Sequence, residues 1–101
     1  MAMVKVCSVK DVPVGSMKGF SQNGKNFLVA NAGGKLCAMD STCTHRGGPL
    51  QEGSLEDGAI QCPLHGSRFD CTTGQPINPP AKAPVKVYPL NVQGDDVLVD
   101  L

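Results

Sequence analysis

Aromatic side chains are scarce in this chain of 101 residues. Trp is absent, Tyr occurs once and Phe three times. Nine basic and nine acidic side chains cancel to a formal net charge of zero. Because the chain has neither an excess of basic residues nor many rings to stack on bases, we expect no binding to nucleic acid. The neutral balance also argues against a strongly charged docking field.

Long apolar runs are missing as well. No stretch approaches the roughly 20 apolar residues that a membrane-spanning helix needs. The start of the chain, MAMVKVCSVKD, has neither the apolar run nor the cleavage site of a secretory signal. We therefore expect a cytoplasmic protein without a membrane partner, built as one domain over residues 1–101. A core this small is marginal, and a bound cofactor can stabilise it.

Histidine is rare, and its positions are informative. The chain has two His, His45 and His65, and each lies within three residues of a Cys. Cys43-x-His45 and Cys62-x-x-His65 form two short arms, which sixteen residues separate. Gly and Pro crowd both arms, where they bring backbone N–H groups close to a ligand and stiffen the turns. The pattern predicts that these four side chains bind one metal centre.

Two thiolates and two imidazoles suit two kinds of centre. Zinc accepts four such ligands tetrahedrally, but its commonest finger spacing pairs Cys with Cys and His with His. In a Rieske-type 2Fe–2S cluster, two Cys hold one iron and two His hold the other. Since each arm here mixes the two residue types, each arm can give one ligand to each iron. The spacing favours the cluster, and a zinc-stabilised β module that acts by binding is the alternative.

The segments CTHRGGPL (43–50) and CPLHGSRFD (62–70) resemble those of Rieske-type ferredoxins. The resemblance implies that Cys43 and Cys62 hold the inner iron and that His45 and His65 hold the outer one. It further implies a one-electron carrier, not an enzyme. We expect this carrier to be a monomer. Such a carrier takes electrons from a flavin or iron–sulfur reductase and passes them to an oxygenase or another redox enzyme.

Several positions around the arms differ from respiratory Rieske proteins, which the chain also resembles. Those proteins link their loops by a disulfide, but Gly48 and Leu64 stand at the corresponding positions here. They also hydrogen-bond the cluster through a Ser and a Tyr, where this chain has Ser67 and Phe69. Because Phe69 has no hydroxyl, we expect a midpoint in the lower part of the range of about −150 to +300 mV. The resemblance favours a third, Pro-rich loop around Pro79 that closes over the cluster.

Three further cysteines lie outside the proposed ligand set. An odd total of five cysteines, without a secretory signal, favours ligand chemistry over a disulfide framework. Cys7 and Cys37 have apolar, strand-like neighbours, which predicts small buried side chains. Cys71 follows the second arm, where it can pack beneath the cluster without being a ligand.

Strand signals run through almost the whole chain. Asn23-Gly24 predicts a two-residue hairpin between strands at 16–22 and 25–31. Other strands are predicted at 3–7, 35–39, 59–61, 67–70, 85–93 and 97–101. No segment has a convincing apolar period of 3.6 residues. We therefore expect an all-β, Rieske-like fold. Its antiparallel base of stacked sheets would comprise residues about 1–40 and 83–101, with a cluster-binding subdomain inserted at about 41–82.

Overall fold

A computed structural model describes residues 3–22, 24–41, 50–56, 58–63, 67–77 and 84–101. These residues form β-strands and two short 3-10 helices, and they contain no α-helix. None of the described helices is long and apolar enough to cross a membrane. The elements in chain order are β1 (Met3–Ser8), η1 (Val9–Asp11), β2 (Met17–Gln22), β3 (Lys25–Ala32), β4 (Lys35–Asp40), η2 (Leu50–Glu52), β5 (Ser54–Glu56), β6 (Ala59–Gln61), β7 (Arg68–Asp70), β8 (Val87–Tyr88), β9 (Leu90–Gln93) and β10 (Asp96–Asp100).

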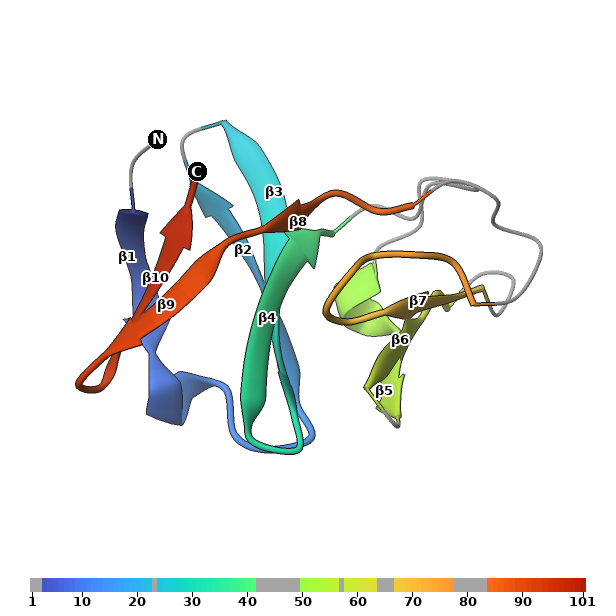
Figure 1. The fold of residues 1–101 in the computed structure, drawn as a ribbon, viewed down its shortest axis with the longest axis horizontal. Coiled ribbons are helices and arrows are strands. Elements are labelled where there is room, and N and C mark those ends of the chain that lie inside the picture. The colour runs from blue at the N-terminus through green and yellow to red at the C-terminus, as the bar shows by residue number, and fades with distance from the viewer. Residues whose placement is uncertain (1–2, 23, 42–49, 57, 64–66, 78–83) are drawn as a thin grey trace.

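The strands form three antiparallel sheets, shown in Figure 1. One sheet has the order β1-β10-β9 and another the order β2-β3-β4-β8. The third sheet, called the small sheet below, has the order β5-β6-β7 and lies beside β4 at the other end of the molecule. The predicted all-β class and the base of stacked antiparallel sheets are confirmed.

Strand β3 is buried on both faces, which explains its continuous apolar run. Phe27 and Val29 belong to the core shared with the β1-β10-β9 sheet, together with Val97 of β10. Leu28 and Ala30 belong to a second core, shared with the small sheet. Successive residues of a strand point to opposite faces, so the two cores alternate along β3. The four-stranded sheet is therefore the middle layer of the molecule.

The local turn signals in the first half of the chain are confirmed. Strands β2 and β3 pair through Gln22 and Lys25, and Gly24 between them has a φ of 74°. Gly adopts this positive φ without the strain that a side chain would add. A 3-10 helix, η1, directly follows the first strand.

The predicted strand at 85–93 is wrong as one element, because it divides into β8 and β9. β8 pairs with β4 and β9 pairs with β10, so the two halves belong to different sheets. Pro89 lies between them, and its nitrogen has no hydrogen for a strand ladder. Its carbonyl still accepts a hydrogen bond from the Asp100 amide, 2.9 Å away. Strand β5 was not predicted, because Ser54–Glu56 contains a single apolar residue, Leu55.

Candidate metal centre

Most of the predicted site lies outside the residues that the structure describes. Those positions are Cys43, His45, Gly48, Leu64, His65 and Pro79. Among the described ranges, no group of three His, Cys, Asp or Glu side chains could hold a metal ion. The described part of the site consists of Cys62, Ser67 and Phe69 together with the chain segments that carry the two arms.

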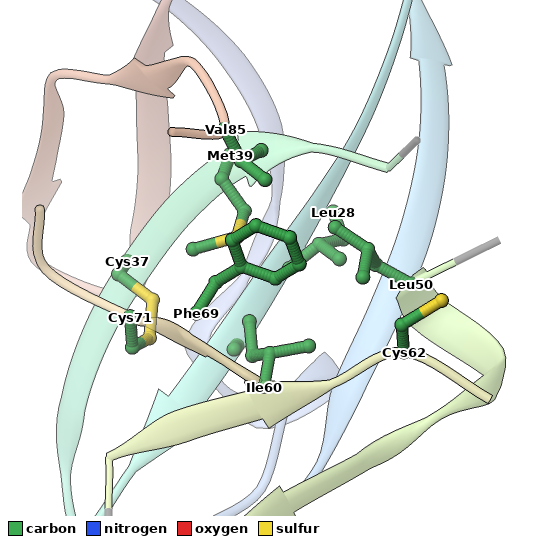
Figure 2. Close-up of a cluster of buried hydrophobic side chains, with 10 residues drawn as sticks. Leu28, Cys37, Met39, Leu50, Ile60, Cys62, Phe69, Cys71 and Val85 are labelled. Carbon is green, nitrogen blue, oxygen red and sulfur yellow. A yellow bond between two sulfur atoms is a disulfide. The ribbon is translucent and has the colours of Figure 1, made fainter. Parts of the chain in front are cut away.

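The second arm begins at Cys62, directly after β6. Its backbone amide donates to the Ser67 carbonyl over 2.7 Å, and this bond extends the pairing of β6 with β7. The Cys62 side chain is 1% exposed. Figure 2 shows its sulfur directed away from the ring of Phe69, at the margin of the apolar core. A thiolate in this position suits a ligand that faces a cluster outside the core.

The first arm leaves β4 and returns at η2, and its two ends are held together. The Leu50 amide donates to the Ser41 carbonyl over 2.8 Å. The Ser41 amide in turn donates to the Asn26 carbonyl of β3 over 3.2 Å. Leu50 is fully buried in the same core as Cys62. The structure therefore brings the ends of both arms to one core, which fits a centre with ligands from both.

Ser67 and Phe69 are the two described members of the predicted cluster surroundings, and they lie on the segment after the second arm. Both are fully buried. The Phe69 ring lies in the core with Met39 and Ile60, as Figure 2 shows. The donor chemistry near Cys62 thus includes a buried hydroxyl from Ser67 but no hydroxyl from Phe69.

Sequence reasoning missed a polar contact at the base of the first arm. The Tyr88 hydroxyl donates to the Asp40 carboxylate at the end of β4. Burial of Tyr88, reinforced by this hydrogen bond, raises the pKa of its phenol to about 12. The ammonium groups of Lys25 and Lys86 lie 5.7 and 5.1 Å from the centre of the Tyr88 ring. The contact depends on a two-residue pairing of β4 with β8, which no local sequence pattern predicts.

Two cysteines that we expected to be unpaired form a disulfide. Cys37 of β4 bonds to Cys71, which directly follows β7, and their Cα atoms are 6.2 Å apart. The burial predicted for Cys37 is confirmed, but the absence of a disulfide is wrong. The partners are 34 residues apart in sequence, so their proximity depends on the packing of β4 against the small sheet. Figure 2 shows the bond beside Ile60 and Phe69.

Cys7 follows the prediction. It is buried and carries a free thiol in the core between β1 and the four-stranded sheet. Burial raises the pKa of this thiol, and the nearby negative charge of Asp11 raises it further. The protonated thiol is therefore favoured, as expected of a small apolar side chain.

Comparison with known proteins identifies the family. The sequence matches the family model described as the Rieske [2Fe-2S] domain over residues 2–89. This chain belongs to the Rieske family. It is 41% identical over 101 residues to the ferredoxin component of biphenyl 2,3-dioxygenase from Rhodococcus jostii (strain RHA1). That match covers 100% of this chain and 94% of the relative.

Solved structures agree with the family assignment. The ferredoxin of carbazole 1,9a-dioxygenase from Nocardioides aromaticivorans IC177 matches this Rieske chain with a TM-score of 0.93 at 31% identity. The match covers 98% of this chain and 97% of that one. A second match is a chain from a complex of reduced oxygenase and oxidized ferredoxin in carbazole 1,9a-dioxygenase. Its TM-score is 0.91 at 33% identity, and the match covers 96% of this chain and 91% of that one.

These matches confirm the predicted family, fold and cofactor. The cofactor of a Rieske domain is one 2Fe–2S cluster, which decides against the zinc alternative. The ferredoxin relatives are electron-transfer components, so the predicted role as a one-electron carrier, not a catalytic enzyme, is confirmed as well. The ends of both arms and the buried Cys62 fit this cofactor.

Proposed function

We propose that this Rieske protein carries single electrons from a flavin or iron–sulfur reductase to the terminal oxygenase of an aromatic-ring dioxygenase system. The observation that carries the proposal is the full-length similarity to the ferredoxin component of a biphenyl dioxygenase. The similarity to a ferredoxin solved in complex with an oxygenase supports the same acceptor class. A carrier of this kind meets each partner in turn and needs no substrate pocket of its own.

In the proposed site, Cys43 and Cys62 hold the inner iron, and His45 and His65 hold the outer one. The bound cluster supplies a one-electron couple. The chain's own contribution is to fix the two arms. The Ser41–Leu50 hydrogen bond closes the first arm. The hydrogen bond between Cys62 and Ser67 supports the second arm.

The surroundings of the proposed cluster come from five further positions. These are Gly48, Leu64, Ser67, Phe69 and Pro79. Ser67 is the proposed hydroxyl donor to the cluster, and its complete burial supports that role. Phe69 is proposed to supply apolar packing beside the site, and its place in the core with Ile60 supports this.

We also propose that the chain is one Rieske domain over residues 1–101. Its base comprises about 1–40 and 83–101, and its cluster-binding insertion comprises about 41–82. All three strands of the small sheet fall within the insertion, whereas the other seven described strands fall within the base. This distribution supports the proposed division.

The proposed carrier is a cytoplasmic monomer. The role itself supports the location, because the carrier must meet both its reductase and its oxygenase in the same compartment. Cell fractionation tests the location, and light scattering of the purified protein tests the monomer. Recovery of the protein with membranes, or a mass twice that of the chain, would contradict these proposals.

The cofactor is tested by low-temperature EPR of the dithionite-reduced protein, with iron, sulfide and zinc assayed on the same sample. We expect two irons per chain and a rhombic signal whose lowered average g reports His ligation. Cys62→Ser should abolish the signal, whereas Cys7→Ser, which removes a buried thiol of the other core, should retain it. A silent spectrum with one zinc and no sulfide would refute the proposed site.

The carrier role is tested by reconstitution. An oxygenase and its reductase should turn over an aromatic substrate when this chain is added, and turnover should stop when Cys62→Ser replaces it. Efficient turnover without the chain, or with the cluster-free variant, would contradict the role of obligatory carrier.

A further inference from the structure

The Cys37–Cys71 disulfide closes a loop that contains all four proposed ligands. Cys37 lies six residues before Cys43, and Cys71 lies six residues after His65. The bond spans 34 residues, and the whole of both arms lies inside this span. The disulfide therefore connects β4, the strand that leads into the first arm, to the residue directly after β7, the strand that follows the second arm.

Both ends of the bond sit in well-fixed backbone. Cys37 is in β4, which is paired on both sides, with β3 and with β8. The Cys71 amide donates to the Gly58 carbonyl over 2.8 Å, which ties it to the turn before β6. The Asp70 carboxylate accepts hydrogen bonds from the backbone amides of Thr72 and Thr73, at 2.8 and 3.0 Å. A covalent link between such segments restrains the sheets, because neither end can move alone.

The disulfide also shares its core with the ends of the arms. Leu50, Cys62 and both disulfide cysteines belong to one buried cluster, shown in Figure 2. If β4 and β7 moved apart, the packing that supports Cys62 and Leu50 would open with them. Respiratory Rieske proteins link the loops themselves, where this chain has Gly48 and Leu64. Here the link joins Cys37 of β4 to Cys71, which directly follows β7.

A cavity of about 330 Å³ reaches the disulfide from outside the core. Its lining includes both cysteines, Leu36, Val87 and Pro89. The sulfur-bearing residues are 9% and 3% exposed, so access is narrow. This cavity has room for a small dithiol to approach the bond.

We propose that the Cys37–Cys71 disulfide is a redox-sensitive crosslink that holds the two ligand arms together and slows loss of the cluster. This inference rests on the proposed ligand set. Reduction by a small dithiol breaks the S–S bond, and two electrons and two protons give two thiols. The dithiol supplies both and becomes a cyclic disulfide. The opened chain then holds its arms through packing and hydrogen bonds alone.

The first measurement is peptide mapping of the disulfide bonds in the native, non-reduced protein. We expect a peptide pair joined through Cys37 and Cys71 in the cluster-containing protein. If both cysteines react with an alkylating agent before any reductant is added, and still do so after exposure to oxidised glutathione, the crosslink does not exist and the proposal is overturned.

The second measurement is the rate of cluster loss, followed by visible absorbance in the presence of an iron chelator. The double variant Cys37→Ala/Cys71→Ala should lose its cluster about tenfold faster than the natural sequence, since a crosslink of this span stabilises the folded chain substantially. Cys7→Ala is the matched control, because it truncates a buried cysteine in the other core and should leave the rate unchanged. Equal rates for the double variant and the natural sequence would overturn the proposal.

Dithiothreitol treatment tests the same step without a substitution, in case the double variant fails to fold. After treatment, the natural sequence and Cys7→Ala should both lose their cluster about tenfold faster, because both contain the disulfide. A folded double variant should show no such acceleration. No acceleration despite demonstrated reduction of the bond would refute the role. A protein that never holds a 2Fe–2S cluster by EPR would refute the proposed function instead, so the two failures are distinguishable.

Discussion

At the scale of single residues, Tyr88 has an environment that can be measured directly. It is the one Tyr of the chain, and Trp is absent. The ultraviolet absorbance change on phenol ionisation therefore comes from Tyr88 alone. Burial and the hydrogen bond to Asp40 raise the pKa of its phenol from 10.0 to about 12. The folded state therefore favours the neutral phenol.

The sign of the resulting pH dependence follows from this shift. The stability that Tyr88 contributes is fully present below pH 10 and is lost as the pH rises towards about 12. We expect the phenolate absorption band, taken as the difference from Tyr88→Phe, to appear with a midpoint near pH 12. Tyr88→Phe should lower the free energy of unfolding by about 1–2 kcal/mol at neutral pH, measured by denaturant titration. A phenolate midpoint near 10 would show that the phenol is exposed.

Ser67 offers a second prediction, which concerns the reduction potential. Hydrogen bonds to the cluster stabilise its more negative, reduced form. If the buried Ser67 hydroxyl makes such a bond, Ser67→Ala should lower the midpoint by about 20–65 mV, the one-electron equivalent of about 0.5–1.5 kcal/mol. Redox titration followed by visible absorbance measures this shift.

A control for Ser67→Ala is available on the exposed side of β5. Ser54→Ala removes a hydroxyl from an exposed position of the small sheet and should leave the midpoint unchanged. Equal midpoints for Ser67→Ala and the natural sequence would remove Ser67 from the proposed cluster environment. The absolute midpoint, expected in the lower part of about −150 to +300 mV, is obtained from the same titration.

At the scale of elements, the turn after β7 has little room for change. Gly74 has a φ of 75°, and a Cβ there would collide with the carbonyl of Val85. The Val85 amide also donates to the Gly74 carbonyl over 2.8 Å. The turn thereby fixes the start of the segment that returns to β8.

We expect Gly74→Ala to destabilise the fold by about 2–3 kcal/mol, because left-handed strain adds to the loss of this hydrogen bond. Gly94→Ala is the matched control. Gly94 also has a positive φ, 63°, but a Cβ there would meet no atom within 4 Å. It should cost about 1 kcal/mol. Thermal or denaturant unfolding that gave equal losses for both variants would contradict the predicted collision.

Elements differ in how readily their sequence predicts them. The β2–β3 hairpin is strongly encoded, because Asn23-Gly24 is flanked by residues that favour strands. The run through β3 predicts a strand, but only the three-layer packing explains why both faces are apolar. β8 and β9 were predicted as one strand, because each is short and their assignment to different sheets depends on distant partners. Short elements carry too little pattern to indicate where they pair.

At the scale of the whole molecule, the two cores predict different responses to loss of the cluster. The core of Phe27, Val29 and Val97 does not include Cys62, the proposed ligand that the structure describes. The other core includes Cys62, so removal of the metal acts on it directly. After chelation we expect amide hydrogen exchange to increase in β5–β7 and to remain slow in β3 and β10. Uniform loss of protection would show that the cluster is required by the entire fold.

The sequence predicts the part of the candidate site that depends on neighbouring residues, namely the residue types and spacing within each arm. Mixed Cys–His arms favour a two-iron cluster over zinc, because a cluster with unlike ligands needs one of each from both loops. The Cys37–Cys71 bond could not be predicted in this way. Its partners lie 34 residues apart, and either cysteine alone fits an apolar strand or turn. The pairing becomes evident only when β4 and the small sheet are packed together.

The two described ends of the chain lie side by side, since Met3 pairs with Asp100 across β1 and β10. In Figure 1 they are at one end of the longest axis, and the small sheet is at the other. The molecule measures 38 Å along that axis. A linker fused to either end would therefore immobilise the protein on an electrode with the small sheet turned towards the solution. Attachment through a residue of the small sheet would reverse this orientation and bring that sheet to the conducting surface.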